Sequence, residues 1–136
     1  MLPRFVPRVL LCLLVLLTGC STAPATGSAP SRSAGAPAAP SWAAGLTTVR
    51  AAALPAEARR TLTLIDRGGP YPYARDGTVF GNHEGLLPRA SRGYYHEHTV
   101  PTPGSRDRGA RRLVTGDEGE VYYTDDHYDS FRAVLR

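Results

Sequence analysis

An α+β fold, with one N-terminal helix packed on a twisted antiparallel β-sheet, is predicted for the C-terminal two-thirds of this 136-residue chain. Two observations lead to this fold class. Residues 54–66 carry apolar residues at helical spacing, whereas the segments after residue 77 alternate in side-chain character with period two. One helix followed by a run of strands is typical of a helix that covers one face of an antiparallel sheet. The length suits one folded domain and not two.

Residues 1–20 are predicted to be an export signal. Arg4 and Arg8 form a basic start, and the apolar stretch 9–17 is too short to span a bilayer as a helix. The signal ends in Leu-Thr-Gly-Cys at Cys20, which resembles a bacterial lipoprotein lipobox, in which the cysteine is lipidated and becomes the new N-terminus. An ordinary secretory signal with an incidental cysteine is the alternative. We therefore expect an exported protein, extracellular or attached to the cell surface as a lipoprotein.

Residues 21–50 are predicted to be a disordered linker, because a segment rich in Ala, Pro, Ser and Gly cannot bury enough apolar surface to offset its ordering entropy. Residues 51–136 form the predicted domain. They contain twelve arginines and twelve acidic residues, so a broad basic footprint for duplex nucleic acid is absent. Cys12 and Cys20 both precede the domain, which excludes a disulfide framework and a zinc–thiolate site within it.

The predicted helix, residues 54–66, has Pro55 in its first turn and Glu57 near its positive end. A Gly-Gly-Pro sequence at residues 68–70 stops it. Its apolar face is formed by residues spaced i, i+4 and i+7: Ala58, Leu62 and Ile65.

The predicted strands lie at residues 78–80, 93–100, 111–115 and 120–124, and a last strand is indicated by the alternation of Phe131, Ala133 and Leu135. Turn signals separate them, at Asp76-Gly77 and at residues 116–119. Side chains alternate between the faces of a strand. In the strand at 93–100, Glu97 therefore shares a face with Tyr95 and Thr99, and His96 and His98 lie on the other face.

Four residues combine into a site for phosphoryl chemistry. Glu97 on a strand has a fixed direction and can act as a base. Arg108 and Arg112 present planar forks that match phosphate oxygens, and His127 titrates near neutrality and can donate a proton. A base, an acid and arginine clamps are what cleavage of an RNA phosphodiester by its own 2′-hydroxyl requires, without a metal or other cofactor.

The sequence resembles the small microbial guanyl-specific ribonucleases, in the bacterial branch that also contains barnase. The resemblance covers about residues 54–131. It rests on four motifs in the family's order and spacing: LPAEARRTLTLI, GPYPYARDGTVFGNHEGLLP, GYYHEHTVPTPGSRDRGARRLVTG and YYTDDHYDSF.

This resemblance implies that Glu97 is the general base and His127 the general acid, with Arg108 and Arg112 stabilising the transition state. The expected function is metal-independent endonucleolytic cleavage of single-stranded RNA after guanosine. The product is a 2′,3′-cyclic phosphate, which is then hydrolysed to a 3′-phosphate.

The resemblance also places guanine recognition at residues 79–84. Glu84 is expected to accept hydrogen bonds from the base, and backbone N–H groups near Asn82 and His83 to donate to it. Phe80 and Tyr128 are expected to flank the base as aromatic surfaces. Relatives often carry glutamine and arginine where this chain has Gly81 and His83, so the strictness of the guanine preference stays open.

The expected partners are single-stranded RNA, a cytoplasmic inhibitor protein and, through a lipidated Cys20, a membrane; the protein is expected to be a monomer. A non-catalytic RNA- or protein-binding lipoprotein on the same fold is the alternative function. A toxin domain delivered to competitors would share the chemistry and differ in its target.

Overall fold

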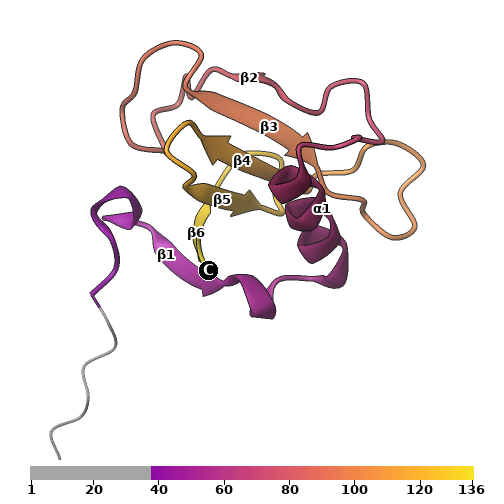
Figure 1. The fold of residues 1–136 in the computed structure, drawn as a ribbon, viewed down its shortest axis with the longest axis horizontal. Coiled ribbons are helices and arrows are strands. Elements are labelled where there is room, and N and C mark those ends of the chain that lie inside the picture. The colour runs from indigo at the N-terminus through magenta and orange to yellow at the C-terminus, as the bar shows by residue number, and fades with distance from the viewer. Residues whose placement is uncertain (1–37) are drawn as a thin grey trace, which may run out of the picture. The chain divides into compact units, whose positions relative to one another are not determined.

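The computed structural model describes residues 38–136, which form one helix and six strands besides two short 3-10 turns. The predicted export signal and its Cys20 lie outside the described residues. The six strands make a single sheet in the order β1-β6-β5-β4-β3-β2, and α1 lies across it (Figure 1). Within residues 38–136, no helix is long and apolar enough to cross a membrane. The predicted α+β class with one helix on a sheet is confirmed.

The helix α1 spans Ala56–Arg67, close to its predicted range. Pro55 is the residue before the first turn, where its missing N–H costs nothing, and Gly68 ends the helix in a left-handed conformation with φ 75°. Ala58 and Leu62 are buried and Ile65 is partly buried. The predicted apolar face is therefore the face that packs on the sheet.

The five predicted strands are all present: β2 spans Thr78–Phe80, β3 Tyr95–Thr99, β4 Arg112–Gly116, β5 Val121–Thr124 and β6 Arg132–Leu135. Neighbouring strands from β2 to β6 pair antiparallel. The turn predicted at residues 116–119 joins β4 to β5 and is closed by a hydrogen bond from the Gly119 N–H to the Gly116 carbonyl.

The structure corrects the sheet type and the start of the folded unit. Residues Thr47–Arg50 form β1, which pairs parallel with β6, so the sheet is mixed and not wholly antiparallel. Just before it, Ser41–Ala43 form a 3-10 turn. The predicted linker, residues 21–50, therefore overlaps the folded unit from Ser41 onward. Local composition misled the prediction because β1 is stabilised by hydrogen bonds to the far end of the chain.

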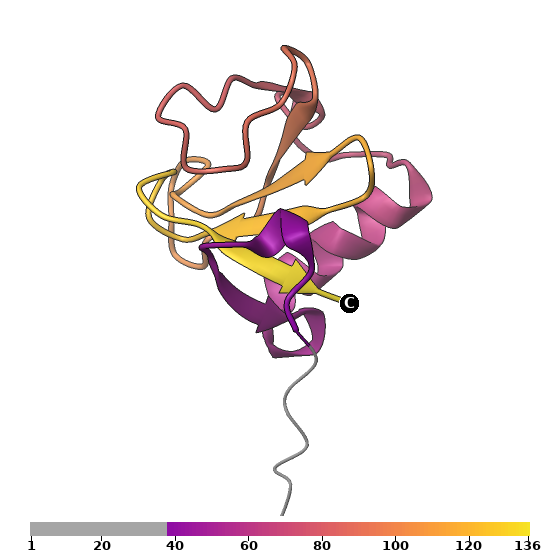
Figure 2. The ribbon, with the colours of Figure 1, turned by 90° about the vertical axis from the view of Figure 1, so that its left-hand side faces the viewer.

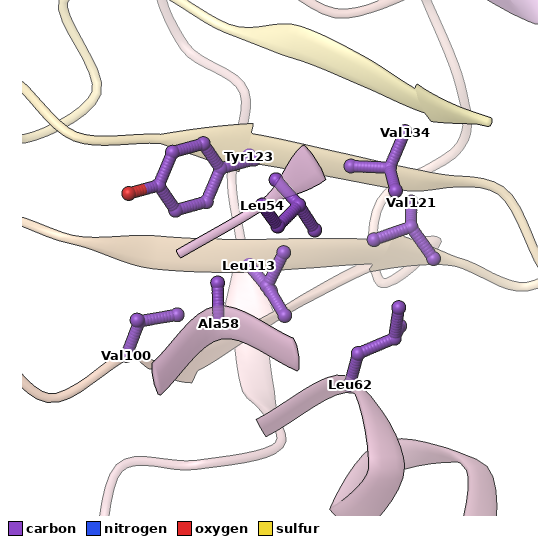
Figure 3. Packing of buried hydrophobic residues seen from close by; sticks show 8 residues of the cluster. All are labelled: Leu54, Ala58, Leu62, Val100, Leu113, Val121, Tyr123 and Val134. Atoms are coloured by element: carbon purple, nitrogen blue, oxygen red, sulfur yellow. The ribbon is translucent and has the colours of Figure 1, made fainter. Parts of the chain in front are cut away.

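The sheet is packed on both faces. The helix α1 lies on one face of the sheet (Figure 2) and closes a core of aliphatic residues and Tyr123 (Figure 3). The sticks in Figure 3 belong to Leu54, Ala58, Leu62, Val100, Leu113, Val121, Tyr123 and Val134. On the other face lies an aromatic-rich cluster, in which the partly buried Trp42, Phe80, Tyr94 and Tyr128 pack against the buried residues Ala43, Leu87, Tyr95, Val114, Tyr122, Phe131 and Ala133. Glu97 pairs across the sheet with Val114, a member of this second cluster, so the carboxylate lies on the face opposite the helix.

Candidate active site

Glu97 lies in the middle of β3 with only 6% of its surface exposed. Its Oε2 accepts a hydrogen bond from the Tyr128 hydroxyl at 2.5 Å, and its Oε1 accepts one from Arg108 Nη2 at 3.2 Å. Arg75 Nε lies 3.6 Å from Oε1. Burial alone would raise the pKa of Glu97, but the hydrogen bonds from Tyr128 and Arg108 and the charges of Arg108 and Arg75 outweigh it and lower the pKa. The carboxylate is thus held in its charged form.

Arg108 reaches this carboxylate from the long loop between β3 and β4. Its Nη2 and Nε also donate to the Thr99 hydroxyl, at 2.7 and 3.0 Å. Thr99 lies two residues after Glu97 on the same strand and therefore on the same face. The strand alternation thus supplies both the carboxylate and the hydroxyl that orient the guanidinium.

Arg112 is the first residue of β4 and is 2% exposed. Its Nη1 donates to the carbonyl oxygens of Gly109 and Arg111 at 2.9 and 2.7 Å, and its Nε donates to the Tyr128 hydroxyl at 3.1 Å. Among the described residues, Nη2 has no hydrogen-bond partner. The guanidinium is therefore rigidly placed, and Nη2 is the nitrogen left to bind a phosphate oxygen.

His127 is exposed in the turn between β5 and β6. Its backbone N–H donates to the Ala110 carbonyl at 3.2 Å, and its ring lies 5.1 Å from the ring of Tyr128. A hollow of about 520 Å³ is lined by His127, Arg108 and Arg112 together with Asp107, Gly109 and Ala110. The structure thus brings the predicted acid and both predicted arginines to one open hollow, and Tyr128 links that hollow to Glu97.

The two histidines of β3, His96 and His98, lie on the face of the sheet opposite Glu97, as predicted. His98 is 4% exposed, on the helix side, with its ring 5.0 Å from that of Tyr71. His96 is half-buried, and its Nδ1 lies 3.0 Å from the Gly77 carbonyl oxygen.

The predicted guanine site, residues 79–84, comprises the end of β2 and the loop that follows it. Asn82 has a left-handed backbone, φ 47°, and its side chain braces the loop: Oδ1 accepts from the Leu87 N–H at 3.0 Å, and Nδ2 donates to the Leu87 carbonyl at 3.0 Å. Glu84 is exposed. Among the described residues, the backbone N–H groups of His83 and Glu84 have no acceptor, so this loop offers a carboxylate and N–H donors that suit the pattern of a guanine edge.

The expectation that Phe80 and Tyr128 flank a base stays a prediction, and in the structure the two side chains contact each other. Their rings stack on each other, with centroids 5.2 Å apart and planes inclined by 20°. A base does not fit between rings at this separation. Tyr128 also directs its hydroxyl to Glu97 and Arg112, so a base held between the two rings requires the rings to separate.

The His83 side chain packs directly against Gly81. A Cβ atom added at Gly81 would lie 2.3 Å from His83 Nε2, so the imidazole fills the volume that a side chain at position 81 would need. The two departures from the family pattern are therefore sterically coupled, which sequence alone does not show.

Three groups at the site escaped sequence reasoning: the Tyr128 hydroxyl, Thr99 and Arg75. Of these three groups, only Thr99 could have been found from the sequence, because strand alternation places it on the same face as Glu97. The loop residue Arg75 and the hydroxyl contact of Tyr128 come from turns whose conformation no local pattern specifies. Within residues 38–136, no group of three His, Cys, Asp or Glu side chains is placed to hold a metal ion.

Comparison with known proteins agrees with this geometry. A family model described as ribonuclease matches residues 37–135. The chain is 60% identical over 91 residues to guanyl-specific ribonuclease St of Saccharopolyspora erythraea. The aligned residues cover 67% of this chain and 90% of the relative. It is 56% identical over 88 residues to guanyl-specific ribonuclease Sa of Kitasatospora aureofaciens, covering 64% of this chain and 92% of the relative.

Solved structures give the same result. A complex of ribonuclease Sa2 with mononucleotides superimposes with a TM-score of 0.66 at 54% identity, covering 67% of this chain and 95% of that one. A structure of ribonuclease Sa2 with guanosine-2′-cyclophosphate gives a TM-score of 0.64 at 53% identity, covering 66% of this chain and 96% of that one.

Proposed function

The chain belongs to the microbial guanyl-specific ribonuclease family, and from this premise we propose that it cleaves single-stranded RNA after guanosine through a 2′,3′-cyclic phosphate. The observation that carries the proposal is the buried Glu97 carboxylate. It is kept charged by Tyr128 and Arg108 and lies next to the hollow lined by Arg112 and His127. A related ribonuclease has been solved with a guanosine cyclic phosphate, which is the intermediate of this route.

In the first step Glu97 removes the proton of the 2′-hydroxyl, whose oxygen attacks the adjacent phosphorus. His127 protonates the departing 5′-oxygen of the next nucleotide. Arg108 and Arg112 stabilise the charge that develops on the phosphoryl oxygens. In the second step water opens the cyclic phosphate, with Glu97 as acid and His127 as base, and leaves a 3′-phosphate.

Guanine recognition is assigned to the loop that follows β2. Glu84 accepts from N1–H and the exocyclic amine, the backbone N–H groups near Asn82 and His83 donate to O6, and Phe80 supports the base. The target must be single-stranded because a paired and stacked base does not reach a loop of this kind.

The test is cleavage-site mapping on a defined single-stranded RNA, with analysis of the new termini. We expect cuts after guanosine, cyclic phosphate ends, and no effect of EDTA. Glu97→Gln and His127→Gln should each lower kcat by about 100-fold or more, since each removes a proton-transfer group. Near-full activity in both variants would refute the mechanism, and no cleavage by the wild type would favour the alternative of a non-catalytic binding protein.

We further propose that the enzyme is exported and anchored through a lipidated Cys20, and that the producing cell protects its RNA with an inhibitor protein. The support is the signal-like sequence of residues 1–20. Incorporation of a radiolabelled fatty acid into the full chain, and its loss in Cys20→Ala, tests the anchor. Capture of a cytoplasmic protein by the Glu97→Gln variant, competed by guanylate, tests the inhibitor.

A further inference from the structure

A second and larger hollow, of about 880 Å³, lies beside the base-reading loop. One wall is formed by residues 79–83 with Gly85 and Leu87, and the other by residues 89–93 with Tyr95. Glu84, Tyr128 and the four proposed catalytic residues are absent from its walls. The hollow therefore adjoins the proposed guanine site, with which it shares Phe80, Gly81, Asn82 and His83, and it shares no lining residue with the hollow of Arg108, Arg112 and His127.

The far wall carries two arginines, Arg89 and Arg92, that are both exposed. Neither makes an ion pair among the described residues, in contrast to Arg75 and Arg108 at the active site. No acidic side chain lines the hollow. Because residues 51–136 carry equal numbers of basic and acidic residues, this is a local concentration of free positive charge, which attracts phosphate.

The same hollow has an apolar floor. Apart from Phe80, which is assigned to guanine, its apolar lining residues are Leu87 and Tyr95, 3% and 4% exposed, and Val79, which is 54% exposed. An apolar floor beside arginines matches the two halves of a nucleotide, with the base on the floor and the phosphate on the guanidinium groups.

We propose that this hollow binds the nucleotide on the 5′ side of the cleaved guanosine, with Arg89 and Arg92 holding the phosphate that joins the two. The inference rests on the proposed function, because it takes residues 79–84 as the guanine site. The 3′ phosphate of that guanosine is assigned to the hollow of Arg108, Arg112 and His127, and the chain continues beyond it on that side. The hollow of Arg89 and Arg92 shares no lining residue with that phosphate hollow and is therefore available to the 5′ neighbour.

The experiment compares kcat/KM for GpC, for the 5′-extended ApGpC and for the 3′-extended GpCpA, in the wild type and in an Arg89→Ala/Arg92→Ala double variant. We expect the 5′ extension to raise kcat/KM of the wild type by about five-fold or more. An exposed ion pair between one arginine and a phosphate strengthens binding by up to about five-fold, and two arginines are available here. The double variant should lose this gain, and its activity on GpC should stay within about two-fold of the wild type.

The matched control is Arg59→Ala/Arg67→Ala, which removes the same charge from exposed positions on α1, across the sheet from the active site. It should keep the 5′-extension gain. An equal loss in both double variants, a gain unaffected by Arg89 and Arg92, or a loss confined to GpCpA would overturn the subsite. Failure of the wild type to cleave GpC would instead overturn the proposed function, and the subsite with it.

Discussion

Glu97 shows how single contacts set the chemistry of this protein. A general base must be ionised at the working pH, and a carboxyl group buried in a sheet tends to be neutral. Here the Tyr128 hydroxyl and the Arg108 guanidinium offset the burial and keep the pKa of Glu97 below its ordinary value. The same Tyr128 oxygen accepts a hydrogen bond from Arg112, so one hydroxyl couples the base to a phosphate-binding group.

Tyr128→Phe should therefore raise the pKa of Glu97, because burial remains and one of the opposing hydrogen bonds is lost. The acidic limb of the kcat/KM profile should move to higher pH. At neutral pH kcat/KM should fall about ten-fold, as expected for one hydrogen bond to a charged group. Tyr123→Phe is the control, since the Tyr123 hydroxyl is buried on the helix face with no hydrogen-bond partner among the described residues. An acidic limb that stays in place in Tyr128→Phe would contradict this account.

A second residue-scale prediction concerns Gly81. Its backbone does not have a positive φ, so alanine is allowed there apart from contact with the His83 imidazole, at 2.3 Å from the new Cβ. Gly81→Ala should displace His83 and raise KM for GpC about three- to ten-fold, with a smaller change in kcat. Adding His83→Ala to Gly81→Ala should restore part of the loss. Strictly additive effects of the two substitutions would show that the residues are independent.

At the scale of elements, the β5–β6 turn is the part that places the acid. His127 and Tyr128 both have left-handed backbones, φ 59° and 73°, which costs roughly 1–2 kcal/mol per non-glycine residue. Asp126 holds this conformation. Its carboxylate accepts from the Thr124 hydroxyl at 2.7 Å, and from the backbone N–H and hydroxyl of Ser130 at 3.0 and 2.5 Å.

Asp126→Ala should loosen the turn and lower kcat/KM about ten-fold or more through misplacement of His127. The pKa of Asp126 is lowered to about 2, mainly by the hydrogen bond from the Ser130 hydroxyl. The ionised carboxylate therefore stabilises the fold fully above about pH 4, and this stabilisation is lost as the pH falls through about 2. Urea unfolding should show the variant less stable than the wild type at pH 5, with the difference shrinking toward pH 2. A difference independent of pH would exclude this role of the carboxylate, and Ser130→Ala should give a weaker effect of the same sign.

Elements differ in how far the sequence predicts them. The helix α1 and the strand β3 carry a complete local pattern, so the face that holds Glu97 was correctly predicted, and the ends of both elements were predicted to within two residues. The strand β1 has four residues in an Ala- and Pro-rich context, and three of them are exposed. It exists because β6 provides its hydrogen-bond partners, and no window of local sequence contains that information. The stacking of Phe80 on Tyr128 is hidden for the same reason, since it joins residues from different strands and turns.

At the scale of the molecule, the two faces of the sheet differ in composition and in role. The helix side is an aliphatic core, and the other side supports the active site on an aromatic cluster. Trp42 belongs to the aromatic side: its ring is nearly perpendicular to that of Tyr122, with centroids 5.7 Å apart, and its carbonyl accepts a hydrogen bond from the Tyr122 hydroxyl at 3.1 Å. Residues before position 51 thus help to cover the face that carries the site.

The fragment 51–136 should consequently be less stable than the fragment 38–136. It lacks β1, so β6 becomes an edge strand, and it lacks Ala43 and Trp42, which cover Tyr122. We expect a loss of about 2–4 kcal/mol in the free energy of unfolding, measured by urea denaturation, from buried apolar area and strand pairing together. Trp42→Ala in 38–136 should account for about 1–2 kcal/mol of it. Where the shorter fragment folds, its kcat on GpC should stay near that of the longer one, because β3, β4 and the β5–β6 turn are intact. Equal stability of the two fragments would mean that β1 and Trp42 add nothing to the fold, and the domain would then begin where the sequence pattern first placed it.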